Sequence, residues 1–173
     1  MPNTYNLIAT SIVGSGGAAS MDFTIIPATY TDLLVKISAR SADSGTDIAI
    51  QFNGSTSTVY KITRLYGTGS GTPTSNNNAS ATSLINNMVT QPSYTASTFG
   101  NGEIYITNYA SSNAKSVSID GVTENNATAS FATFTAGLWS PATQAAITSI
   151  KLISDGGNFA QHSTAYLYGI SNS

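Results

Sequence analysis

Apolar and polar residues alternate along most of this chain, as they do in β-strands that bury one face and expose the other. In the segment 33–40, for example, apolar Val35 and Ile37 alternate with Lys36 and Ser38. Turn sequences such as Asp120-Gly121 separate the alternating runs, and no stretch of a dozen residues has the apolar face of an amphipathic helix. The pattern predicts about ten short strands among eleven candidate segments, at roughly 5–13, 19–26, 32–41, 46–53, 58–66, 82–90, 98–108, 114–120, 128–138, 146–154 and 162–170.

We expect these strands to form a single domain over residues 1–173, because a chain of this length can bury one core. Many short strands separated by turns favour an all-β fold, an antiparallel β-sandwich of the jelly-roll type. The apolar positions of the alternating segments should line the core: Leu33, Val35, Ile37, Ile48, Ile50, Phe52, Ile104, Ile106, Val117, Ile119, Ile150, Leu152 and Leu167.

The segment 68–80 breaks the alternation and contains neither a charged residue nor a strong hydrophobe. We therefore expect it to be the longest loop of the domain. Loops of this length are uncommon unless they have a function, such as contacting a partner. A loop tip without a role is the alternative, and the sequence does not decide between the two.

Charged residues are rare: Lys and Arg number 6 and Asp and Glu number 8, about 8% of the chain, against roughly 25% in a typical soluble protein. Enzymatic and metal chemistry depends on ionisable side chains. The composition therefore favours a binding or structural protein over an enzyme, and it predicts neither a cofactor nor a metal. A low net charge, here −2, also favours self-association.

Several classes of protein do not fit the sequence. The absence of a basic cluster argues against nucleic-acid binding, and the longest apolar runs are far shorter than the ~20 residues of a membrane span. The N-terminal residues lack the basic and apolar regions of a signal peptide. Cysteine is absent, so we expect neither disulfides nor a thiolate zinc site.

His162 is the one histidine and the natural candidate for a general base. Asp155 is the nearest acidic residue in the sequence, but the Gly-x-Ser-x-Gly motif of a serine hydrolase is absent. We interpret His162 as a surface or interface residue. The sequence accordingly predicts that the chain is not an enzyme.

Two glycine-containing turns place carboxylates four residues apart, Asp43 with Asp47 and Asp120 with Glu124. Calcium is bound by oxygen ligands in loops of this kind. Neither segment matches the EF-hand pattern, and Asp-Gly is primarily a turn sequence. We therefore assign no metal site and keep calcium as the minor alternative.

Several segments, in this order along nearly the whole chain, resemble a family of structural proteins of tailed bacteriophage virions. They are Ile12–Ser20, Phe23–Leu33, Gln51–Gly54, Ile104–Tyr109, Ala136–Trp139, Ala146–Ile150 and Ala165–Ile170. The resemblance implies a β-sandwich domain on the virion, with no catalytic residue. It does not distinguish a head protein from a tail protein.

We expect a capsid decoration (cement) protein, made in the bacterial host cytoplasm, that binds the major capsid protein on the outer surface of the assembled phage head. The alternative is the tip of a tail or head fibre that recognises host polysaccharide, since aromatic, amide and hydroxyl side chains suit both sugars and protein interfaces. By analogy with phage heads, we favour a homotrimer. Tyr94 and Trp139 are the aromatic residues that we expect at the partner contact, with core packing as the alternative for Trp139.

Overall fold

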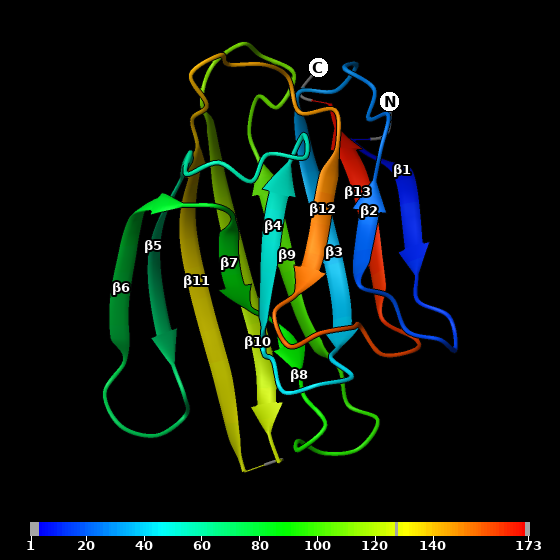
Figure 1. Cartoon of the computed structure of the whole chain (residues 1–173), viewed down its shortest axis with the longest axis vertical. Helices are drawn as coiled ribbons and strands as arrows, with labels where there is room; N and C mark the ends of the chain where they lie inside the picture. Colours follow the sequence, from blue (N-terminus) through cyan, green and yellow to red (C-terminus); the bar gives the residue numbers. More distant parts are fainter. Residues whose placement is uncertain (1–3, 127, 172–173) are drawn as a thin grey trace.

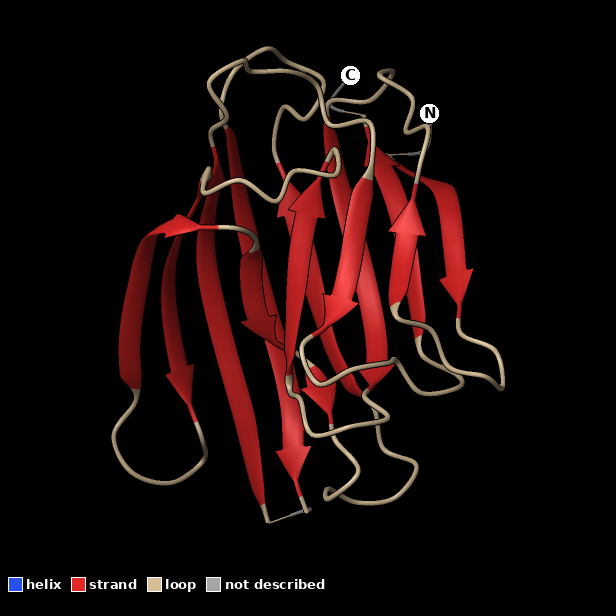
Figure 2. Cartoon of the chain, viewed as in Figure 1, coloured by secondary structure: helices blue, strands red, loops and turns tan. Residues whose placement is uncertain are grey.

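The computed structural model describes residues 4–126 and 128–171, and in this part of the chain all regular structure is β (Figures 1 and 2). The predicted all-β class is therefore confirmed. The strands are β1 (Tyr5–Ile12), β2 (Ser20–Phe23), β3 (Asp32–Arg40), β4 (Asp47–Phe52), β5 (Tyr60–Gly67), β6 (Thr74–Ala81), β7 (Leu84–Asn87), β8 (Val89–Thr90), β9 (Gly100–Ile106), β10 (Lys115–Asn125), β11 (Ala129–Trp139), β12 (Ile150–Ser154) and β13 (Thr164–Ile170).

The strands form two sheets that pack face to face. The large sheet has the order β1-β13-β3-β9-β10-β11-β5-β6, and the small sheet has the order β2-β12-β4-β7. All pairings are antiparallel except that of the two-residue strand β8, which runs parallel to β3. The four-strand sets β1-β13-β3-β9 and β2-β12-β4-β7 have the strand order of a jelly roll, so the expected sandwich is confirmed.

Two hairpins widen the large sheet beyond the jelly roll. The β10–β11 pair continues the sheet from β9, and β5 and β6 follow at the far side. In Figure 1 the small sheet lies in front of one part of the large sheet, while β11, β5 and β6 extend past it on the left. The large sheet is thus wider than the sheet that covers it. We call the four strands β10, β11, β5 and β6 the extension.

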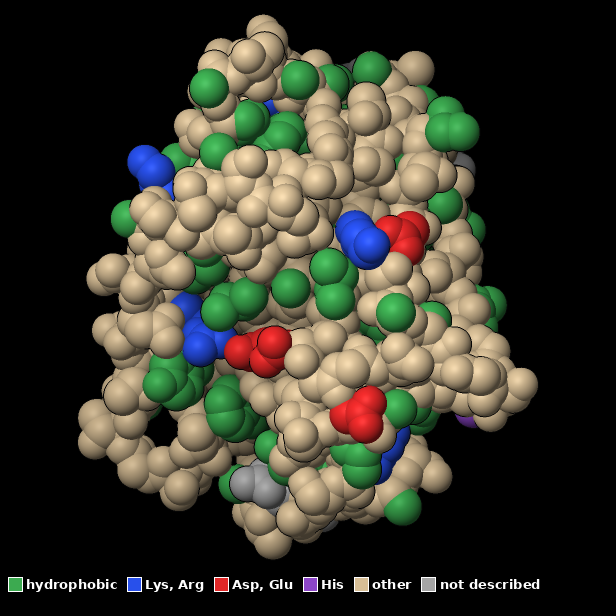
Figure 3. Space-filling model, viewed as in Figure 1, with side chains coloured by type: hydrophobic (Ala, Val, Ile, Leu, Met, Phe, Trp, Pro, Cys, Tyr) green, Lys and Arg blue, Asp and Glu red, His purple; other side chains and the backbone are tan. Residues whose placement is uncertain are grey.

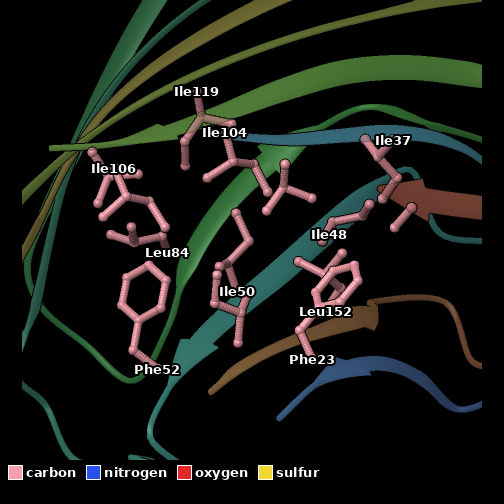
Figure 4. Close-up of a cluster of buried hydrophobic side chains, with 14 of the residues drawn as sticks. Phe23, Ile37, Ile48, Ile50, Phe52, Leu84, Ile104, Ile106, Ile119 and Leu152 are labelled. Atoms are coloured by element: carbon pink, nitrogen blue, oxygen red, sulfur yellow. The ribbon is translucent and has the colours of Figure 1, made fainter. Parts of the chain in front are cut away.

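The core lies between the two sheets and consists of the inward-facing residues of both. All thirteen residues predicted for the core are buried, with Ile50 and Ile104, for example, fully inaccessible to solvent. Figure 4 shows side chains from both sheets pointing toward one another in this layer. Period-2 alternation therefore predicted the strand register correctly wherever the small sheet covers the large one.

The structure corrects three predicted segments. The predicted turn Asp120-Gly121 lies inside strand β10, which continues to Asn125 and does not end at residue 120. Residues 74–81 form strand β6 and not part of a loop, and the predicted strand 82–90 is divided into β7 and β8 around Met88. Strand β6 was missed because it lies at a sheet edge with most of its residues exposed, so it needs no apolar alternation. Strand β6 and the division of the segment 82–90 account for the difference between the eleven predicted segments and the 13 described strands.

Close backbone contact between the sheets depends on glycine. The segment through Met88 passes directly over Gly100, Gly102 and Gly121, on the inner face of β9 and β10. A Cβ atom on Gly121 would lie 2.3 Å from the carbonyl oxygen of Asn87. Only hydrogen at these positions leaves room for the chain that enters β8.

Replacing Gly121 with alanine should therefore destabilise the fold by about 1–3 kcal/mol, the usual cost of overpacking. Gly67→Ala is the matched control, because a Cβ atom on Gly67 of β5 meets no atom within 4 Å. The control should be neutral or slightly stabilising, since alanine restricts the unfolded chain. Urea unfolding of both variants measures the difference, and equal stability would contradict the proposed backbone contact.

Candidate binding surface

The extension departs from the usual polarity of a sandwich sheet beside β7, although part of its inner face belongs to the core, through Val117, Ile119, Tyr60, Ile62 and Trp139. Its inner face carries polar residues opposite β7: the Thr135 hydroxyl donates to the Ile85 carbonyl oxygen (3.1 Å) and lies 3.0 Å from the side-chain oxygen of Asn86. Thr123 makes a longer contact of 3.5 Å with the side-chain oxygen of Asn87. Hydrogen bonds, and not apolar packing alone, thus join this part of the large sheet to the small one.

Three large apolar side chains of the extension lie on its outer face and are exposed. Leu65 is 56% exposed, Phe134 48% and Val122 41%. The strand register places Leu65 of β5 opposite Phe134 of β11, and Val122 of β10 opposite Ala132. We call Leu65, Val122, Ala132, Phe134 and Ala136 the outer apolar patch.

Small side chains beside Phe134 hollow this surface. One hollow of about 420 Å³ lies between Leu65, Val122 and Phe134, and another of about 200 Å³ lies between Tyr105, Phe134 and Ala136. A third, of about 440 Å³, lies over β11, β5 and β6. The Phe134 ring therefore stands between two hollows, and side chains of another protein can insert into them.

A row of charged residues borders the outer apolar patch. Lys36, Glu103 and Asp120 are opposite one another on β3, β9 and β10, and Lys36 forms an ion pair with Glu103. Burial raises the pKa of Asp120 above its usual value, and the nearby Glu103 carboxylate raises it further. In this row the ion pair of Lys36 is with Glu103 and not with Asp120, and Asp120 lies opposite Phe134.

Asp120→Asn should raise the free energy of unfolding at pH 7. The raised pKa means that the folded state disfavours the charged form, so the carboxylate opposes folding above its unfolded pKa. As the pH falls and both forms become neutral, the difference between the variant and the wild type should vanish. Urea unfolding at pH 7 and about pH 3 measures this, and a variant less stable than the wild type at pH 7 would contradict the assignment.

Tyr94 is half-buried in the loop between β8 and β9, and this loop is fixed by two charged residues. The Arg40 guanidinium donates to the carbonyl oxygens of Thr95 and Thr98, at 3.0 Å each. The Glu124 carboxylate accepts hydrogen bonds from the Thr95 backbone N–H (3.1 Å) and from the Thr98 hydroxyl (2.8 Å). Tyr94 therefore remains a predicted contact residue, on a loop with a defined shape.

Trp139 does not lie at the surface of this chain. It is only 3% exposed, and its ring packs edge-on against Phe52 at a centroid distance of 5.7 Å. Trp139 is the inner-face partner of Tyr60 at the end of β11. The structure thus corrects the expected exposure of Trp139 and supports the core alternative, because β11 extends one residue further than predicted.

The remaining candidate residues are separated or already paired. His162 is exposed in the turn before β13, with a φ of 72° and its backbone N–H bonded to Val13. Asp47 forms an ion pair with Arg64 (3.2 Å), and Glu124 holds the loop described above. Among residues 4–126 and 128–171, no three His, Asp or Glu side chains form a group that could hold a metal ion.

A second cluster lies on the inner face of the extension, beside β7. Tyr66 and Phe131 stack with ring centroids 6.3 Å apart, and the Arg64 guanidinium lies 5.2 Å from the Tyr66 centroid. The hydroxyl of Thr133, opposite Tyr66 in the strand register, is buried and has no hydrogen-bond partner in the described structure. We call Arg64, Tyr66, Phe131 and Thr133 the inner aromatic cluster.

Sequence reasoning missed both surfaces. The outer apolar patch does alternate in sequence, since Ala132, Phe134 and Ala136 occupy every second position, but this pattern predicts burial of the wrong face.

Figure 3 shows the other side of the molecule, where charged side chains are few and scattered over a mostly polar surface. The described part of the chain contains no helix that could cross a bilayer. Comparisons with protein-family models, with curated proteins and with solved structures found no match to this chain.

Proposed function

We propose that this chain is a structural protein of a tailed-phage virion, a capsid decoration protein that binds the outside of the assembled head through the outer apolar patch. The observation that carries the proposal is the group of exposed apolar side chains on the outer face of the extension. A stable sandwich buries all of its predicted core residues and still exposes Leu65, Val122 and Phe134 together on one face. Grouped exposed hydrophobes of this kind mark interaction sites.

The chemistry of the surface favours adhesion over catalysis. The hollows around Phe134 are lined mainly by apolar, hydroxyl and phenol groups, with Asp120 as the one carboxylate. Arg40, Arg64, Asp47 and Glu124 are engaged in contacts within the fold. A surface of this type forms contacts by burying apolar area and by neutral hydrogen bonds.

Binding to the assembled head would stabilise it by mass action. A protein that binds the shell, and not the free capsid subunits, shifts the equilibrium toward the shell by an amount set by its concentration and affinity. This mechanism requires no catalytic group and no cofactor. It requires a rigid module with one adhesive face, which the sandwich and the outer apolar patch together provide.

Leu65→Asp should abolish binding to phage heads that lack the protein. Contact with the head would remove water from the new carboxylate, and one partner side chain does not offset the free energy that this costs. Leu7→Asp is the matched control, because Leu7 is equally exposed, at 56%, but lies on β1 at the far edge of the sheet. Co-sedimentation of each variant with heads measures binding, and the melting temperatures of both verify the fold.

Binding of the wild type should also persist in about 1 M salt, because apolar contacts are not screened as ion pairs are. Loss of binding in salt, or equal loss in the two variants, would contradict the proposed surface. Failure of the wild type to bind heads at all would contradict the decoration function itself.

The inner aromatic cluster supports one alternative, a fibre-tip module that binds host polysaccharide. Stacked Tyr66 and Phe131, the guanidinium of Arg64 and the unpaired hydroxyl of Thr133 combine an aromatic surface with polar groups. Amide side chains on β6 border this face, with Asn76 opposite Arg64. Such a combination suits a sugar ring, which has an apolar face and hydroxyl groups at its rim.

Tyr66→Ala should remove glycan binding if this alternative holds, because it removes the ring that stacks on Phe131. Tyr105→Phe is the control, since it changes a tyrosine on the opposite face of the sheet. Retention of the wild type and both variants on immobilised host polysaccharide measures the effect. Absence of wild-type retention would reject the alternative and leave the decoration proposal standing.

A further inference from the structure

Strand β6 forms one edge of the large sheet and pairs only with β5. Its outer edge therefore presents a row of backbone donors and acceptors that no described strand satisfies. In Figure 1, β6 lies at the left margin of the molecule, beyond the small sheet. An edge of this kind is a template for an additional strand.

Natural proteins usually protect such edges with lysine, proline, a bulge or a short strand. Strand β6 has eight residues, Thr-Ser-Asn-Asn-Asn-Ala-Ser-Ala, none of them charged and none of them proline. Its pairing with β5 is regular from Thr74 to Asn78, and an irregularity follows between Asn78 and Ala81. Five successive residues are thus flat, exposed and unprotected.

The other sheet edges are less suited to pairing. Strand β1 has an irregularity in its pairing between Leu7 and Ala9. Strands β2 and β7 have four residues each, and Asp22 lies within β2. Strand β7 is also placed against the inner face of the extension. Among the described edges, β6 offers the longest uninterrupted run without a charge.

We propose that β6 pairs with β6 of a second copy of this chain, antiparallel about a two-fold axis near Asn76. The occupant follows from the sequence of the edge. About this axis Asn76 meets its own copy, Ser75 meets Asn77, and Thr74 meets Asn78. Every pair combines hydroxyl and amide groups that can hydrogen-bond across the strands, and no pair brings like charges together. An antiparallel strand that meets itself forms a closed, isologous interface, so the product is a dimer.

This inference does not depend on the function proposed above, and it replaces the homotrimer expected by analogy. Pairing through β6 joins two large sheets into one continuous sheet. The two outer apolar patches then belong to one assembly, because Leu65 is opposite Ser75 in the strand next to the new interface. A dimer would thus present two copies of the patch to a repeating surface.

Asn76→Lys tests the pairing, because it places two ammonium groups opposite each other at the two-fold axis. Like charges directly opposite destabilise strand pairing, so we expect the dimer dissociation constant to rise by about tenfold or more. Asn76 is exposed, but the new ammonium group also lies opposite Arg64 within the monomer, so we expect the melting temperature to fall by about 2–4 °C at most. The dissociation constant is therefore measured well below the melting temperatures of both variants. Ser118→Lys is the control: it adds the same charge at an exposed position in the middle of the sheet.

Light scattering across a concentration series should show a dimer for the wild type and for Ser118→Lys, and a shift toward monomer for Asn76→Lys. Hydrogen exchange should show amides of 74–78 that become protected as the wild-type concentration rises. A wild type that stays monomeric, a trimer, or an Asn76→Lys dimer of unchanged affinity would overturn the proposal. Loss of the dimer in Ser118→Lys alone would indicate that the contact lies on the outer face of the sheet, and it would also overturn the proposal.

Discussion

The backbone of Asn87 packs directly against Gly121, where a Cβ atom would lie 2.3 Å from the Asn87 carbonyl oxygen. The close approach of the small sheet to β10 therefore depends on glycine at this position. Because Gly100 and Gly102 leave the same space open, the backbone around Met88 can rest directly on β9 and β10. The segment then leaves the small sheet and pairs with β3 as β8. The small sheet therefore ends at β7, and the outermost strands of the large sheet extend past it.

This arrangement explains the polarity of the extension. Strand β7 brings Asn86 and Asn87 to the inner face, so that face requires hydrogen-bonding partners, which Thr135 and Thr123 provide. Leu65, Val122 and Phe134 lie on the opposite side, where no described element covers them. The exposed position of Phe134 is thus a consequence of how the two sheets meet, and the fold retains it without any cost to the core between β4 and β9.

Alternation predicted the covered part of the molecule well, including Val117 and Ile119 of β10, and the outer part of the extension poorly, for one physical reason. Between the sheets, burial of Ile50 or Ile106 removes apolar area from water, and the period-2 pattern records that burial. In the outer part of the extension, Leu65 and Phe134 face solvent while Thr133 faces the protein, so the same pattern indicates the wrong face there. Strand β6 has no apolar pattern at all, because most of its residues face solvent on both sides. Its pairing with β5 depends on backbone hydrogen bonds, which composition does not reveal.

The size of the outer apolar patch sets a limit on what one copy can achieve. Fully burying one large apolar side chain contributes about 1.5–3 kcal/mol, whereas association costs at least about 4 kcal/mol in lost translational and rotational freedom. Leu65, Val122 and Phe134 are already partly buried, so their contribution is smaller than the full values. A single patch therefore supports only weak binding. On a surface with many identical sites, two patches joined through β6 make the second contact intramolecular, and the avidity then exceeds the affinity of either patch without any new type of interaction. Under the proposed function and the proposed β6 dimer, the weak apolar patch and the unprotected edge strand would act together on a repeating lattice, because the dimer supplies the second contact that a single patch lacks.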